Sequence, residues 1–221
     1  MTKKFIVPYV VASLAMAAAI SVASSDGAVV ARSYSGYNNQ KPSVAADYTY
    51  QTVGIPWNNT YVEVTATQAR EIKDGIVIFA YPRCPYCRNL ISELTSIAKE
   101  KNQTVYYCQI DEYRDIYAYD ENTGAPVMTK AAGEGYDELL NWLQDYLADY
   151  TISDKDKNKY EIGEKRIGAP TIVRIEDGEP VSTWKLSSVE DVSYPENKYD
   201  SWDDTVRVKV SDSLRDYFEE A

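Results

Sequence analysis

The sequence predicts an α/β fold in which helices flank a central sheet. Strand-like and helical segments alternate between residues 61 and 110, an order that builds an open sheet with helices on its faces. A continuous apolar strand over residues 76–81 leads into the motif Cys84-Pro85-Tyr86-Cys87, and a helical pattern follows it. Residues 172–186 then have the pattern of a strand, a tight turn and a returning strand.

The first 31 residues are typical of a signal peptide or an N-terminal anchor. Lys3 and Lys4 precede an apolar run over residues 5–23, and small residues follow at Ser21-Val22-Ala23 and at Val29-Val30-Ala31. The run is also just long enough to span a bilayer, so an uncleaved anchor is the alternative to a cleaved signal. In both cases we expect an exported protein, either extracellular or at the cell surface.

Residues 32–59 are predicted to be a flexible linker, and residues 60–219 a folded domain. The linker is rich in Ser, Tyr, Asn and Gln, and few of its apolar residues recur with any period. The full length of 221 residues suits one domain with attachments of this kind.

Helix and strand signals define the first half of the domain. Residues 61–64 alternate like a strand, and Thr65 with Gln68 has the form of a capping box, which begins a short helix. A longer helix is expected over residues 85–101, with an apolar face formed by Leu90, Ile91, Leu94, Ile97 and Ala98. Residues 104–110 form the next strand. Its Cys108 is expected to be either a buried apolar side chain or a third redox thiol.

The end of the chain is expected to complete the sheet and to cover it. Residues 176–180 are a hairpin turn, which joins the strand before it to a return strand over residues 181–186. Asp203 and Asp204 have the character of a helix start, and the apolar residues after them fit a closing helix. Residues 206–210 also alternate like a strand, so this boundary stays open.

The Cys-x-x-Cys motif is the candidate active site. Pro85 suits the first position of a helix, so Cys84 is expected at the helix N-terminus, where free N–H groups and the dipole stabilise a thiolate. Cys87 follows one turn later, and Arg83 adds positive charge beside the pair. A thiolate attacks a partner's disulfide, and the second cysteine resolves the mixed disulfide. A structural disulfide and half of a zinc site are the alternatives.

Composition restricts the other chemistry that this chain can perform. With 3 cysteines and no histidine, it cannot assemble a zinc site with four nitrogen or sulfur ligands, and we expect neither a metal nor a cofactor. The lack of histidine also excludes Ser-His-Asp and Cys-His catalysis in their usual forms. The net charge of −11 argues against nucleic acid and anionic membrane surfaces as partners. Membrane contact is therefore expected only through the N-terminal segment, if it is uncleaved.

The strand, the C-P-Y-C motif with its helix and the later sequence Gly168-Ala169-Pro170-Thr171 resemble the thioredoxin superfamily. Residues 75–111 are similar to the bacteriocin transport accessory proteins of Gram-positive bacteria, which are thioredoxin-like. The resemblance covers roughly residues 60 to 219, and it implies a thioredoxin-like central mixed sheet with flanking helices. It also implies that Pro170 is a cis-proline facing the motif, in a loop with Ala169 and Thr171 whose backbone pairs with an extended substrate.

The resemblance also marks where this chain departs from the superfamily. Residues 112–163 are longer than a minimal thioredoxin needs, and we expect a helical insertion there, with an amphipathic helix over residues 135–150. Ile78 stands where thioredoxins have a buried aspartate, so proton transfer by that route is in doubt. Arg83 replaces the tryptophan that precedes the thioredoxin motif. Pro85-Tyr86 is the dipeptide of glutaredoxins, whose reduction potentials run from about −200 to −230 mV.

These observations favour an exported thiol–disulfide oxidoreductase, with Cys84 as nucleophile and Cys87 as resolving thiol. Its expected partners are a disulfide-containing secreted peptide or protein and a redox protein that recycles the motif. An outside location and a low pKa of Cys84 favour forming or reshuffling disulfides over reducing them. The alternatives are a non-catalytic accessory module that binds an exported peptide and a membrane-tethered thiol reductase.

Overall fold

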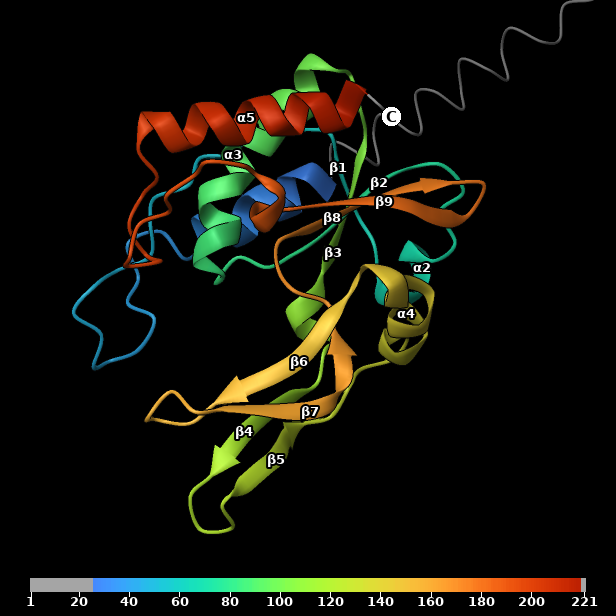
Figure 1. The fold of residues 1–221 in the computed structure, drawn as a ribbon. Coiled ribbons are helices and arrows are strands. Elements are labelled where there is room, and N and C mark those ends of the chain that lie inside the picture. The colour runs from blue at the N-terminus through green and yellow to red at the C-terminus, as the bar shows by residue number, and fades with distance from the viewer. Residues whose placement is uncertain (1–25, 220–221) are drawn as a thin grey trace, which may run out of the picture.

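The computed structural model describes residues 26–219, and its centre is a five-stranded mixed sheet (Figure 1). The strand order is β1-β3-β2-β8-β9, with the bounds Tyr61–Glu63, Val105–Gln109, Gly75–Ala80, Thr171–Glu176 and Glu179–Lys185. The first three of these strands run parallel, β8 runs antiparallel to β2, and β9 runs antiparallel to β8. The expected α/β class and the mixed sheet with flanking helices are therefore confirmed.

Strand β2 is the centre of the sheet and of both hydrophobic cores. Its residues Ile76 to Ala80 are each 0% exposed, because β3 and β8 pair with its two edges and helices cover its two faces. Ile76, Ile78 and Ala80 belong to one core, whereas Val77 and Phe79 belong to the other. A strand covered on both faces needs apolar residues at every position, which explains the continuous apolar run in the sequence.

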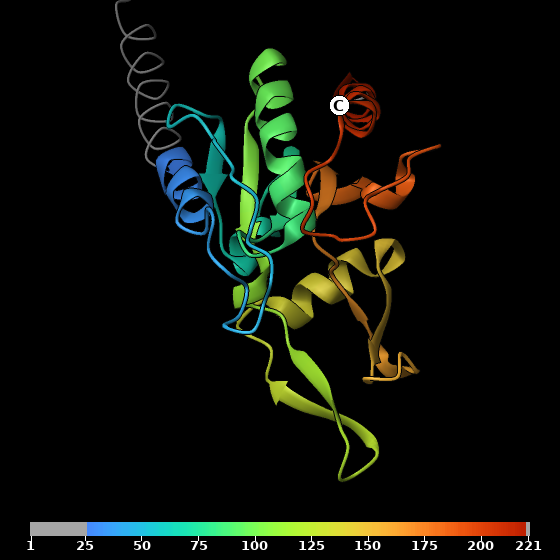
Figure 2. The same cartoon turned by 90° about the vertical axis from the view of Figure 1, so that its left-hand side faces the viewer.

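Helices form a layer on each face of the sheet (Figure 2). The first face carries α3 (Pro85–Glu100), α5 (Asp204–Glu219) and a helix over residues 26–35. The second face carries α2 (Ala66–Ala69) and α4 (Tyr136–Leu143). The expected closing helix is confirmed, and its apolar side chains Val206, Val210, Leu214, Tyr217 and Phe218 are buried. The alternative strand over residues 206–210 is wrong.

Two local signals from the sequence are confirmed in the structure. The Thr65 side chain accepts a hydrogen bond from the Gln68 N–H, and the Gln68 side chain accepts one from the Thr65 N–H, so the capping box of α2 is complete. In the β8–β9 turn, Asp177 and Gly178 have φ values of 53° and 86°. Positive φ at both central residues is the pattern of the tight hairpin turn that fits the strand twist.

The prediction that residues 32–59 are a flexible linker is wrong, because the segment packs against the domain. Tyr34 is fully buried, and Val53 and Ile55 lie in the same core as α3 and α5. Asn38 ties the segment to itself, since its side chain both donates to the Val53 carbonyl and accepts from the Val53 N–H. The packed unit therefore includes residues before 60.

Most of the predicted signal peptide or anchor lies outside the described residues, which begin at 26. Residues 26–31 are part of the first described helix, in which Val30 and Ala31 are 1% and 4% exposed. Cleavage after Ala31 would remove side chains that pack in the core. Among residues 26–219, no helix is both long and apolar enough to cross a membrane.

The expected helical insertion over residues 112–163 is wrong in composition, because two β-hairpins account for most of it. The hairpins are β4 (Ile116–Asp120) with β5 (Ala125–Lys130), and β6 (Ala148–Ser153) with β7 (Lys159–Arg166). They project together from one end of the sheet (Figure 1). The predicted helix over 135–150 ends earlier, since α4 stops at Leu143, a 3₁₀ turn follows over Gln144–Tyr146, and β6 then begins.

Aromatic side chains explain why this segment forms strands. Tyr119 and Tyr160 bring the two hairpins together with ring centroids 4.6 Å apart, and Tyr117 packs edge-on against Tyr150 at 5.7 Å. Tyrosine, threonine and β-branched residues fit the pleated surface of a strand better than a helix. The helical spacing of apolar residues predicted a helix up to residue 150, but tertiary contacts of these aromatic side chains favour strands in the last part of that range.

Candidate active site

The two motif cysteines lie at the carboxyl end of β2, where the chain turns into α3. Cys84 is the N-cap of α3 and Pro85 occupies its first turn, as the sequence predicted. Cys84 and Cys87 are 3% and 1% exposed, and both are free thiols. The backbone N–H of Cys87 donates a hydrogen bond to the Cys84 sulfur over 3.4 Å. The helix start therefore holds the Cys84 sulfur against its own N–H groups.

The loop before β8 closes over the first cysteine. The peptide bond between Ala169 and Pro170 is cis, as the resemblance implied, and the Cys84 thiol donates a hydrogen bond to the Ala169 carbonyl over 3.4 Å. The Thr171 hydroxyl donates to the Gly168 carbonyl over 2.9 Å, which fixes the turn. The structure thus brings together two predicted parts of the site that lie 85 residues apart in the chain.

Hydrogen bonding and burial separate the acidities of the two thiols. A hydrogen bond from the Cys87 thiol is the main cause that lowers the pKa of Cys84, and the backbone N–H groups of Cys87 and Tyr86 act in the same direction, against burial. Burial, followed by the neighbouring Cys84, raises the pKa of Cys87 well above its ordinary value. Cys84 is therefore the thiol that ionises first and the better nucleophile at neutral pH.

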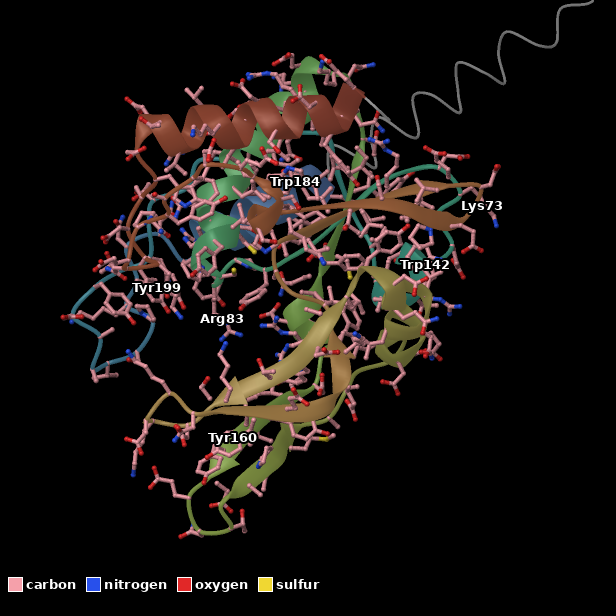
Figure 3. The ribbon with its side chains drawn as sticks, viewed as in Figure 1. Lys73, Arg83, Trp142, Tyr160, Trp184 and Tyr199 are labelled. Carbon is pink, nitrogen blue, oxygen red and sulfur yellow. The ribbon has the colours of Figure 1, made fainter. Side chains whose placement is uncertain are left out.

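The cation that acts on Cys84 is not the one that the sequence indicated. Arg83 was expected to lower the pKa of Cys84, but its side chain is 56% exposed and pairs with Asp111 over 3.1 Å. Figure 3 shows Arg83 beyond the start of α3, on the side of the hairpins. Arg114 instead lies over the Tyr81 ring, 4.6 Å from its centroid, and its charge helps to lower the pKa of Cys84.

Sequence reasoning missed Arg114, although a topological signal for it exists. Arg114 follows β3, and β3 runs parallel to β2, which ends just before the motif. The carboxyl ends of adjacent parallel strands lie at the same edge of a sheet, so residues after β3 approach residues after β2. That rule predicts that residues 111–114 lie near the motif, but it does not predict which of their side chains acts on the thiol.

Replacing Arg114 with glutamine is expected to raise the pKa of Cys84. The thiolate fraction at pH 6 should fall, and the alkylation rate of Cys84 with it, by roughly two- to fivefold, because a thiol below its pKa loses thiolate tenfold per pH unit. The measurement is the pH dependence of iodoacetamide alkylation, whose curve should move to higher pH. Arg83→Gln is the matched control and should leave the curve in place. A larger shift from Arg83→Gln would contradict this assignment.

Arg88 connects the active-site helix to the N-terminal segment. Its side chain is 2% exposed, and its guanidinium donates to the carbonyls of Pro82, Tyr34 and Gln51 and to the Asn38 side chain. The guanidinium also lies 5.5 Å from the centroid of the Tyr50 ring. Arg88 therefore fixes the motif and the segment before residue 52 in one arrangement.

A cavity of about 560 Å³ opens beside the cis-proline. Its apolar wall is built by parts far apart in the chain: Tyr86, Leu147, Tyr150, Pro170, Leu186 and Tyr194. Tyr86, predicted as a motif residue, is 37% exposed and forms the rim nearest to the thiols. Strand β6 belongs to the same wall, so the inserted hairpin shapes the surface next to Cys84.

The third cysteine does not join this site. Cys108 lies in β3 with its side chain in the core of the second face, whereas Cys84 and Cys87 belong to the first. Burial raises the pKa of Cys108 to about 12, so its thiol is unreactive at neutral pH. Of the two expectations for Cys108, the buried apolar side chain agrees with the structure.

None of the family models, curated proteins or solved structures compared with this chain matches it. The functional argument therefore depends on the residues and the geometry of this chain.

Proposed function

We propose that this protein is an exported thiol–disulfide oxidoreductase with a thioredoxin-like fold. The observation that carries the proposal is the position of Cys84, at the N-terminus of α3, with its sulfur 3.4 Å from the carbonyl that precedes cis-Pro170. A nucleophilic thiol, a second thiol one turn later and a backbone edge facing them are the parts that disulfide exchange requires.

The proposed reaction proceeds in two exchanges. In the reducing direction, the Cys84 thiolate attacks a client disulfide, one client sulfur leaves, and a mixed disulfide forms. Cys87 then attacks Cys84, which releases the second client sulfur and leaves the motif oxidised. In the oxidising direction the same steps run in reverse, and the client gains the disulfide. A redox partner must then restore the starting form of the motif.

The lowered pKa of Cys84 supports the oxidising direction. A thiol with a low pKa is stabilised in the reduced form of the motif, so the disulfide form is a stronger oxidant. We therefore propose that the protein forms or reshuffles disulfides in secreted peptides or proteins. The client would lie extended along Ala169, with an apolar side chain in the cavity beside Pro170.

The test is the reduction potential of the Cys84–Cys87 pair. The full-length chain is equilibrated with glutathione buffers, its free thiols are alkylated, and the fraction of reduced protein is measured. We expect a value between about −120 and −200 mV, which is the range of oxidases and isomerases. A value of about −270 mV would point to a thiol reductase and overturn the proposed direction. A disulfide that resists reduction below about −300 mV would favour a binding module without catalysis.

A further inference from the structure

The inserted hairpin of β6 and β7 leaves one edge of β6 without a ladder partner. Within residues 26–219, β6 pairs with β7 in a two-stranded sheet, so the backbone groups on its other edge belong to no ladder. Figure 1 shows β6 on the side of this hairpin toward the central sheet. An edge of this kind is a template for pairing with another extended segment.

This unpaired edge lines the cavity beside Pro170. Residues 148–151 of β6 are four consecutive residues of the cavity wall, whereas β7 contributes Arg166. Successive side chains of a strand point to opposite faces, so a cavity that contacts four residues in a row lies along the edge of the strand. Because a strand rises by about 3.3 Å per residue, this part of the wall is about 10 Å long and matches an extended segment of about four residues.

The cis-proline loop supplies a second stretch of backbone to the same cavity. Residues 168–171 are also consecutive in its wall, and the Ala169 carbonyl accepts the hydrogen bond of the Cys84 thiol. A client bonded to the Cys84 sulfur is therefore held beside Ala169, at the wall of the cavity that residues 148–151 also line. Its backbone has one stretch of protein backbone on each side.

The side chains of the wall favour an uncharged client segment. Asp149 pairs with Lys165 over 2.7 Å. Lys185 donates to the Tyr146 carbonyl, and Arg166 donates to a backbone carbonyl over 3.3 Å. Each charged side chain of the wall thus has a partner within the chain. A charged client side chain would lose its hydration there without gaining a partner, whereas a large apolar one is buried against the aromatic and leucine side chains of the wall.

We propose that the unpaired edge of β6 is a second binding edge for the client, which adds an extended strand between β6 and the cis-proline loop. This inference rests on the proposed function. The client class is then an extended, uncharged segment that carries the reacting sulfur and, close to it, a large apolar side chain. Main-chain hydrogen bonds to β6 supply affinity, and the cavity supplies selectivity for the side chain.

The test traps a client in the full-length Cys87→Ser protein. The probe is a short synthetic peptide without charged side chains, whose single cysteine carries a 2-thiopyridyl disulfide and has a phenylalanine next but one to it. The Cys84 thiolate attacks the peptide sulfur, the bond to the pyridyl sulfur breaks, and thiopyridone leaves with the electron pair and takes up a proton. Amide hydrogen exchange of residues 148–151 should then slow by about tenfold or more. Exchange in β5, an edge strand of the other hairpin, should stay unchanged.

Filling the cavity is an independent measurement. Ala148 is exposed and lies in the cavity wall, so Ala148→Trp should occupy the space of the client without disturbing a core. Its rate of reaction with the peptide should fall by about tenfold, whereas its rate with hydroxyethyl disulfide, which is too small to need a binding edge, should stay close to wild type. Ala125→Trp, at an exposed alanine of the other hairpin, is the matched control and should change neither rate.

Unchanged exchange of residues 148–151 in the peptide-bound protein would overturn the inference, and so would an equal loss of rate with both disulfides in Ala148→Trp. If that variant fails to fold, the exchange measurement decides. Slow exchange of residues 148–151 in the free protein, together with a dimer in analytical ultracentrifugation, would overturn it in favour of a second copy of this chain. A protein that forms no mixed disulfide with either probe would instead contradict the proposed function.

Discussion

Replacing Cys84 with serine is expected to abolish thiol–disulfide exchange down to the uncatalysed level. The Cys84 sulfur is the better nucleophile of the pair because hydrogen bonds and Arg114 lower its pKa, while burial raises that of Cys87. A serine hydroxyl cannot form a disulfide, and Cys87, whose pKa burial raises well above its ordinary value, is a poor nucleophile in its place. The measurement is the reduction of insulin by dithiothreitol in the presence of the full-length protein.

Replacing Cys87 with serine is expected to have a different outcome, so the two variants together distinguish the nucleophile from the resolving thiol. Cys84 can still attack a client, but no thiol one turn later resolves the mixed disulfide, so the covalent complex should accumulate. Non-reducing electrophoresis or intact mass detects it. Cys108→Ser is the matched control and should behave like wild type, because Cys108 lies in the opposite core. Full activity of Cys84→Ser would show that Cys84 is not the nucleophile.

Replacing Arg88 with methionine is expected to lower the free energy of unfolding by roughly 3–5 kcal/mol, with a fall in Tm of about 10 °C. The substitution removes the donor for the buried carbonyls of Tyr34, Gln51 and Pro82. Each acceptor left without a partner in the interior loses free energy, and the contact with the Tyr50 ring is lost as well. Thermal and urea unfolding of the full-length protein give the measurement.

Two further variants test whether the stability lost in Arg88→Met comes from the buried hydrogen bonds of the guanidinium. Arg88→Lys should recover only part of the stability, because a single ammonium cannot match the planar fork that reaches several oxygens at once. Arg215→Met is the matched surface control. Arg215 is 41% exposed and pairs with Glu100 and Asp212, so its loss should cost about 1 kcal/mol or less. An equal loss from Arg88→Met and Arg215→Met would contradict the buried role of Arg88.

Local signals in the sequence were reliable where the residues that cause a structural feature lie within the same short segment. Pro85 and the cysteine before it marked the start of α3, and Thr65 with Gln68 marked the start of α2. The continuous apolar run over residues 76–81 predicted the strand that β2 forms, and the structure shows residues 76–80 of it fully buried. Each of these features depends on steric or hydrogen-bonding preferences within a few residues, so no distant part of the chain can reverse it easily.

Predictions failed where distant packing decided the outcome. The polar segment over residues 32–59 was expected to be flexible, but Arg88 and the first core hold it in place. The insertion was expected to be helical, but aromatic contacts such as that of Tyr119 with Tyr160 favour hairpins. Arg83, adjacent to Cys84 in the chain, pairs with Asp111, whereas the charge of Arg114, which follows β3, helps to lower the pKa of Cys84.

The sequence by itself determined which chemistry we propose, because two thiols at a helix start, and no histidine, leave few reactions open. Tertiary structure alone decided the surroundings of those thiols: the carbonyl of Ala169 over Cys84 and the charge of Arg114. The reason is that acidity depends on burial and on charges within a few ångströms, and neither follows from proximity along the chain.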